Sequence, residues 1–177
     1  MRIHAMRHAE SEYNLFGLCN DDPARNVNLT ETGRRQAETA AQKLRDLPLD
    51  AIFCSQLPRA RQTAEIISRP HDAAVNPRAE LNDIRSGCDG EPVAEYFRRI
   101  AHDRLHARVG DGETLLEHKR RILGFLDWLK TRQCYRHILL VAHEETLRVF
   151  KAFAEGLVDE AMLELNFANC DIYQFQL

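Results

Sequence analysis

The sequence predicts an α/β fold: a three-layer sandwich in which a mainly parallel, mixed central sheet is flanked by helices. Short apolar runs typical of strands alternate along the chain with amphipathic helical patterns, and this alternation indicates a mainly parallel sheet. No repeats, low-complexity tracts or long linkers interrupt the 177 residues. We therefore expect residues 1–177 to form a single domain, which is long enough to bury a sizeable core.

The first part of the chain contains a strand, a loop and a helix. Residues 2–7 are apolar enough for a buried strand, and residues 9–28 form a polar loop rich in turn residues. Thr30 is the expected N-cap of a helix, and Pro48 ends it. The apolar face of this helix follows the 3.6-residue period and comprises Ala37, Ala40, Ala41, Leu44 and Leu47.

Further strands and helices follow in alternation. Residues 51–54 are expected to form a short buried strand. Ser55 offers an N-cap, and Pro58 lies near the first turn of a helix that runs to about Ser68. The remaining expected elements are a strand at 73–75, a loop over 80–92, helices at 93–107 and 113–131, a strand at 137–142, a helix at 145–156 and a last strand at 171–176.

Composition excludes several function classes. The net charge of −3 argues against nucleic acid as the main partner, because such proteins usually carry a basic face. No apolar run approaches the ~20 residues of a membrane helix, and the sequence leading from Met1 into the first strand lacks the features of a signal peptide. The five cysteines are scattered and odd in number, which favours reduced thiols in the cytoplasm over disulfides or a zinc site. The sequence leaves a homodimer open.

Two histidines, 135 positions apart, mark the expected functional site. His8 and His143 each follow an apolar strand-like run. Ligands of open α/β folds bind at the carboxyl edge of the sheet, so both side chains are expected there. Arg7 precedes the first histidine, and its guanidinium fork is suited to phosphate oxygens. The pattern therefore predicts a centre that handles phosphate.

Six segments extend this pattern over nearly the whole chain. They are residues 7–14 (RHAESEYN), 29–37 (LTETGRRQA), 54–64 (CSQLPRARQTA), 81–87 (LNDIRSG), 112–114 (GET) and 141–143 (VAH). In order and spacing they resemble the RHG-E-[ST]-x-x-N, LTxxGxxQA, SxLxRAxxTA, LxE…G and GE[ST] blocks and the second-histidine strand of the histidine phosphatase superfamily, the phosphoglycerate mutase-like enzymes. The resemblance implies a phosphomonoesterase acting on a small phosphorylated substrate.

The chemistry of phosphate transfer suggests a role for several polar residues of these segments. A neutral imidazole can attack phosphorus and form a phosphoenzyme, and we assign this role to His8. Arg7 and Arg59 can grip the phosphoryl oxygens, with His143 as a further donor. Because these groups supply the positive charge, neither a metal nor a cofactor is expected. The remaining candidate substrate contacts are Ser11, Asn14 and Glu144.

The chain departs from the family pattern at three positions. The family's LxE glutamate, which protonates the leaving group, is replaced by Asp83; the acid is therefore Asp83 or the nearby Glu80. Ala9 replaces a glycine, which requires a negative φ at this position. Glu144 replaces the glycine that follows the second histidine. Its carboxylate either raises the pKa of His143 by charge pairing or faces solvent.

Three functions are compatible with these residues. The leading one is hydrolysis of phosphomonoesters through a phosphohistidine on His8. The second is phosphoglycerate mutase-type transfer; only 59 residues, 84–142, lie between Asp83 and His143, whereas mutases have a longer segment that shields the phosphorylated intermediate. The third is a non-catalytic binder of phosphorylated ligands.

Overall fold

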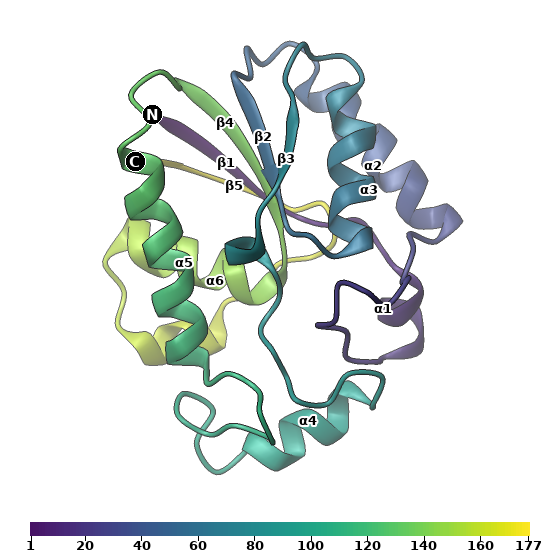
Figure 1. Cartoon of the computed structure of the whole chain (residues 1–177), viewed down its shortest axis with the longest axis vertical. Coiled ribbons are helices and arrows are strands. Elements are labelled where there is room, and N and C mark those ends of the chain that lie inside the picture. Colours follow the sequence, from purple (N-terminus) through teal and green to yellow (C-terminus); the bar gives the residue numbers. More distant parts are fainter.

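A five-stranded sheet lies at the centre of the computed structural model, which describes residues 1–177 (Figure 1). The strands are β1 (Arg2–Arg7), β2 (Ala51–Cys54), β3 (Val75–Pro77), β4 (His137–Ala142) and β5 (Ile172–Gln176). They are ordered β3-β2-β4-β1-β5, and β5 alone runs antiparallel to its neighbour. The mainly parallel, mixed sheet predicted from the sequence is confirmed.

Helices cover both faces of the sheet, which confirms the three-layer arrangement (Figure 1). The α-helices are α1 (Glu12–Phe16), α2 (Glu31–Leu44), α3 (Pro58–Ser68), α4 (Val93–Ile100), α5 (Leu115–Lys130) and α6 (Glu144–Glu155). Helices α2 and α3 pack together over one face, and α5 and α6 over the other. Two 3₁₀ helices, η1 (Ala79–Leu81) and η2 (Asp159–Glu164), complete the chain. None of the helices is both long and apolar enough to cross a bilayer.

Strand β4 shows how the two cores are built. Alternate side chains of a strand point to opposite faces. Ile138 and Leu140 join the core beneath α5 and α6, whereas Leu139 and Val141 join the core beneath α2 and α3. All four side chains are fully buried. Burial on both faces explains why this strand is continuously apolar in sequence.

Several boundaries differ from the expected ones. Thr30 is confirmed as an N-cap, because its hydroxyl accepts a hydrogen bond from the Gly33 amide over 2.9 Å. Helix α2 nevertheless ends at Leu44, and a turn leads on to Pro48. The prediction for Ser55 is wrong: Leu57 is the N-cap residue of α3, and the Ser55 hydroxyl instead accepts from the Leu57 amide.

Three further elements were misplaced or missed. β3 lies at 75–77 rather than 73–75, and α4 ends at Ile100 rather than 107. Beyond it, the Asp103 carboxylate accepts hydrogen bonds from the amides at 105 and 106 and fixes a turn. Helix α1, a 5-residue helix, interrupts the predicted loop over 9–28.

The arrangement of β1 and β4 positions the site. These strands are parallel neighbours, and Arg7 pairs in register with Ala142. The residue after each strand is a histidine, so His8 and His143 leave the sheet side by side. Helix α4 and the segment before it lie beyond this carboxyl edge, on the same side as α1 (Figure 1).

Candidate active site

His8 and His143 meet at the carboxyl edge of the sheet, as predicted. Their ring centroids lie 5.1 Å apart, with the rings edge to face. The His8 amide continues the sheet by donating to the Ala142 carbonyl over 2.9 Å. Both residues are almost wholly buried, with 3% and 1% of their surfaces exposed. The register of two parallel strands thus brings together residues that are distant in sequence.

The contacts of His8 define its protonation. Its Nδ1 lies 2.7 Å from the Ala9 carbonyl oxygen, which can only accept, so Nδ1 carries the proton. Its Nε2 therefore holds the lone pair, and it accepts from Nε of Arg59 over 3.0 Å. Burial, followed by the positive charge of Arg59, holds the pKa of His8 well below 6.5. The imidazole is neutral at physiological pH.

Arg59 lies at the centre of the site and is 4% exposed. It belongs to the first turn of α3, whose N-terminus points toward the carboxyl edge of the sheet. The Nη2 atom of Arg59 donates to Asp83 Oδ2 over 3.0 Å and lies 3.2 Å from Nδ1 of His143. The Asn20 carbonyl and side chain accept from the same guanidinium. Asn20 was not singled out in the sequence; a polar residue in a predicted loop gives no sign of this contact.

Ala9 follows the nucleophilic candidate without strain. The single non-glycine residue with positive φ is Cys170, so the φ of Ala9 is negative, as an alanine at this position requires. Its side chain is fully buried, and its amide donates to the Thr63 hydroxyl over 3.1 Å. The backbone beside His8 is therefore anchored to α3.

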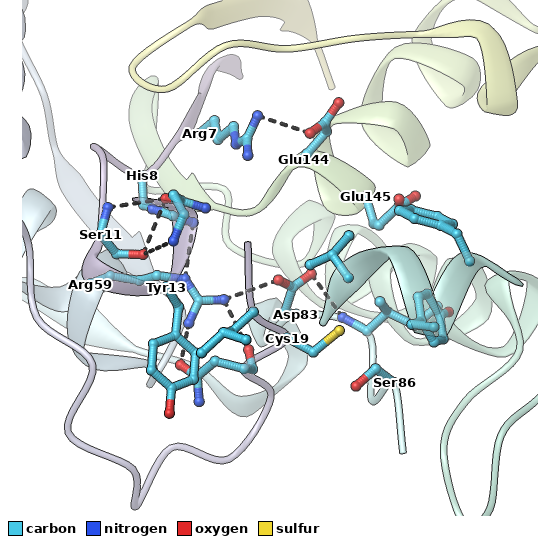
Figure 2. Close-up of a pocket in the computed structure, with 17 residues that line it drawn as sticks. Arg7, His8, Ser11, Tyr13, Cys19, Arg59, Asp83, Ser86, Glu144 and Glu145 are labelled. Atoms are coloured by element: carbon cyan, nitrogen blue, oxygen red, sulfur yellow. Dashed lines mark hydrogen bonds and ion pairs between the residues drawn. The ribbon is translucent and has the colours of Figure 1, made fainter. Parts of the chain in front are cut away.

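Glu144 behaves differently from both expectations. Its Oε2 pairs with Nη1 of Arg7 over 2.8 Å (Figure 2). Its Oε1 pairs with Nη2 of Arg148 over 3.0 Å. It does not raise the pKa of His143, which burial and then Arg59 hold well below 6.5. Nor does it simply face solvent, since its side chain is 25% exposed. Glu144 links two arginines at the edge of the site.

The structure separates the two candidate acids. Asp83 Oδ2 lies 3.0 Å from Nη2 of Arg59 and 3.4 Å from Nδ1 of His143. Glu80 instead accepts from Nε of Arg78 over 3.1 Å, and this hydrogen bond lowers the pKa of Glu80. Glu80 does not line the cavity in front of the histidines, whereas Asp83 does.

Ser11 and Asn14 form the capping box of α1. The Ser11 hydroxyl accepts from the Asn14 amide over 3.3 Å, and the Asn14 side-chain oxygen accepts from the Ser11 amide over 3.0 Å. Both residues line the cavity. Asn14 also receives a contact from Asn169, which donates to the backbone carbonyl of His8. The short helix thus holds two polar side chains beside the nucleophilic candidate.

A partly buried ion pair fixes the segment that carries Asp83. Arg121 of α5 donates to the carbonyls of Glu80, Asn82 and Asp83 over 2.8, 2.9 and 3.1 Å. Its charge is balanced by both oxygens of Glu113, over 2.9 and 2.7 Å. Glu113 belongs to the GET segment, for which the sequence suggested no role. This motif acts through Arg121 on the position of Asp83.

The cavity in front of the histidines has a volume of about 160 Å³. Arg7, Arg59 and Asp83 line its inner end, and Glu144 and Glu145 line one side (Figure 2). Tyr13, Leu18, Ile84, Val93, Tyr96 and Phe97 form apolar and aromatic walls. Tyr13 and Ile84 belong to two of the six sequence segments. Leu18 lies in the predicted loop over 9–28, and the other three belong to α4; the sequence contained no motif at these positions.

A family model supports what the geometry indicates. Residues 3–177 match the model described as the histidine phosphatase superfamily, branch 1. The chain belongs to the histidine phosphatase superfamily. This confirms the resemblance found in the sequence motifs.

Relatives in this superfamily are similar over most of their length. The chain is 30% identical over 171 residues to the adenosylcobalamin/alpha-ribazole phosphatase of Escherichia coli, covering 92% of this chain and 83% of the relative. It is 32% identical over 179 residues to the uncharacterized phosphatase PhoE of Bacillus subtilis, covering 93% and 87%. The crystal structure of the alpha-ribazole phosphatase from Shigella flexneri superposes with a TM-score of 0.89 at 26% identity, covering 98% and 89%. Together with the family match, these relatives identify a phosphomonoesterase.

Proposed function

We propose that this phosphatase acts by double displacement at His8. The Nε2 lone pair attacks phosphorus, the bond from phosphorus to the ester oxygen breaks, and a phosphohistidine forms. Asp83 in its acid form gives its proton to the departing oxygen. Water then attacks the phosphohistidine and gives a proton to Asp83, which releases inorganic phosphate and restores neutral His8.

The tautomer of His8 is the observation that supports this proposal most directly. With the proton on Nδ1, the lone pair on Nε2 points toward Arg59 and not into the sheet. The donor to this lone pair is the guanidinium of Arg59, a group that binds phosphate oxygens. When a phosphoryl group binds Arg59 in its place, Nε2 is free to attack phosphorus. Nucleophile and anion site are therefore contiguous.

Positive charge for the transferring group is available from the chain itself. Arg59 and Arg7 provide guanidinium donors, and the Nε2 atom of His143 is buried without a hydrogen-bond partner. Such groups stabilise the charge that develops on the equatorial oxygens. We infer that no divalent metal takes part in the reaction. In this proposal, Ser11 and Asn14 contact the same equatorial oxygens of the phosphoryl group.

Turnover assays test the proposal. Hydrolysis of p-nitrophenyl phosphate should survive exhaustive treatment with EDTA; loss of activity that a divalent ion restores would overturn it. No hydrolysis at all, with retained binding of inorganic phosphate, would identify a non-catalytic binder. Conversion of phosphoglycerate in the presence of bisphosphoglycerate, faster than hydrolysis, would identify a mutase instead.

The natural substrate is proposed to be a small phosphomonoester, because the cavity volume is only about 160 Å³. All five cysteines are unpaired, including the buried Cys19, Cys54 and Cys88. Thiols persist where glutathione and thioredoxin keep them reduced, so we propose that the enzyme acts in the cytoplasm.

A further inference from the structure

The cavity has two chemically different ends. The inner end holds His8 and the two arginines, and the outer end receives the group that is cleaved from phosphate. The outer end is bounded by the apolar and aromatic walls described above and, on one side, by Glu144 and Glu145 (Figure 2). A leaving group bound there must be compatible with both surfaces.

No cation is left over for an anionic leaving group. The lining contains two arginines and no lysine. Arg59 is paired with Asp83, and Arg7 with Glu144. If phosphate binds as proposed, it takes up both guanidinium groups. Glu144, which pairs with Nη1 of Arg7, places a carboxylate in this part of the lining.

The carboxylates at the outer end are supported from behind. Arg148 contacts one oxygen of Glu144 and one of Glu145, each over 3.0 Å. Arg104 stacks on Phe97 and adjoins Glu145 in a neighbouring hollow. Neither arginine lines the cavity itself. Arg148 holds the two glutamates in place. The cavity wall on this side contains the two glutamates and the aromatic rings.

On the basis of the proposed phosphatase function, we propose that this cavity selects phosphomonoesters whose leaving group is uncharged or cationic and has an apolar or aromatic body. A leaving group that bears a carboxylate is rejected, because it would face Glu144 and Glu145 without a cation to pair with. Rejection by unfavourable charge is a common source of specificity. A carboxylate within a few ångströms of two others should lose on the order of 10–100-fold in kcat/KM.

Three aryl phosphates of similar shape test this selectivity: phenyl phosphate, 4-carboxyphenyl phosphate and 4-(aminomethyl)phenyl phosphate. Their leaving phenols are of similar acidity, so differences in kcat/KM report on the charge of the distal group. We expect the aminomethyl and unsubstituted compounds to be cleaved efficiently and the carboxyl compound poorly. In Glu145→Gln and Glu144→Gln, the ratio of kcat/KM for the carboxyl compound to that for phenyl phosphate should rise several-fold.

The control is Glu160→Gln, which removes the same charge from an exposed residue that does not line the cavity. It should leave the ratio unchanged. Equal kcat/KM for all three compounds in the wild type, or a preference for the carboxyl compound, would overturn the inference while leaving the phosphatase function intact. So would an unchanged ratio in both glutamine variants. Absence of hydrolysis of phenyl phosphate would instead refute the proposed function itself.

Discussion

Nε of Arg59 donates a hydrogen bond to Nε2 of His8 over 3.0 Å, and this contact joins the phosphate-binding group to the nucleophilic candidate. The same guanidinium contacts Asp83 and His143. Arg59 lies in the first turn of a helix and is almost wholly buried, so its position is fixed. It therefore holds His8, Asp83 and His143 in a defined arrangement. The geometry of attack, charge stabilisation and proton donation thus depends on a single residue.

Arg59→Lys should therefore impair catalysis although it preserves the positive charge. A lysine cannot reproduce the planar set of donors, and loss of one such donor typically lowers kcat by about 10²–10³-fold. Steady-state kinetics with p-nitrophenyl phosphate measures the effect. Arg61→Lys is the matched control, since Arg61 is an exposed residue two positions further along the same helix. Equal activity of the two variants would contradict the role of Arg59.

Asp83→Asn should slow alkyl phosphates far more than p-nitrophenyl phosphate. A general acid contributes about 10²–10⁴-fold, and less when the leaving group is itself acidic. Comparing kcat/KM for the two substrate types measures this difference. Glu80→Gln should show no such difference, because Glu80 pairs with Arg78 away from the cavity.

Asp83→Glu should retain substantial activity if the position of the carboxyl group is what matters. Equal losses on both substrate types in Asp83→Asn would mean that the residue positions phosphate and does not donate a proton. A difference that arises in Glu80→Gln instead would transfer the role of acid to Glu80.

Arg121→Lys should reproduce the behaviour of Asp83→Asn in weaker form. Arg121 holds three carbonyls of the segment that carries Asp83, and lysine cannot span all three. Misplacing a catalytic group by an ångström can cost about 10²-fold. We expect kcat on alkyl phosphates to fall more than kcat on p-nitrophenyl phosphate, with KM little changed. The control is Arg120→Lys at the exposed neighbouring residue. A uniform loss on both substrates would indicate a purely structural role.

His4 should make stability depend on pH. It is buried on β1, and neither ring nitrogen has a hydrogen-bond partner. Burial, followed by the nearby His137 and Arg2, lowers its pKa below 6.5. The unfolded chain therefore binds this proton at a higher pH than the folded chain does. The resulting stability is present above about pH 6.5 and is lost as the pH falls toward the folded-state pKa.

Urea unfolding at about pH 7.5 and about pH 5.5 measures this dependence. His8, His118 and His143 have lowered pKa values and act in the same direction. We expect the loss of unfolding free energy between the two conditions to be smaller in His4→Gln than in the wild type. His102→Gln, at an exposed residue, should leave the loss unchanged. If His4→Gln loses as much unfolding free energy between the two pH values as the wild type, His4 does not cause the pH dependence.

Local sequence patterns predicted the sheet and the residues at its carboxyl edge. Strands β1, β2 and β4 are short, largely buried runs. A residue that follows such a run lies at the edge of the sheet, as His8 and His143 do. Thr30 was recognised because capping depends on a side chain and an amide three residues apart. These features depend on neighbours in sequence, which a single chain displays directly.

Contacts between distant segments could not be predicted in the same way. Asn20 contacts Arg59 across 39 positions, and Arg121 contacts the carbonyl of Asp83 across 38. Glu144 was recognised as unusual, but its pairing with Arg7 depends on the register of β1 and β4. Such contacts follow from the three-dimensional arrangement and leave no periodic signal.

The central claim is that His8 becomes phosphorylated during turnover, and rapid acid-free quenching with intact-protein mass spectrometry tests it most directly. The wild type, mixed with an excess of p-nitrophenyl phosphate, should gain the mass of one phosphoryl group, and peptide mapping should place it on His8. His8→Ala should keep its fold by circular dichroism yet gain no mass and show no turnover. Phosphorylation of the His8→Ala protein at the wild-type level would contradict the account.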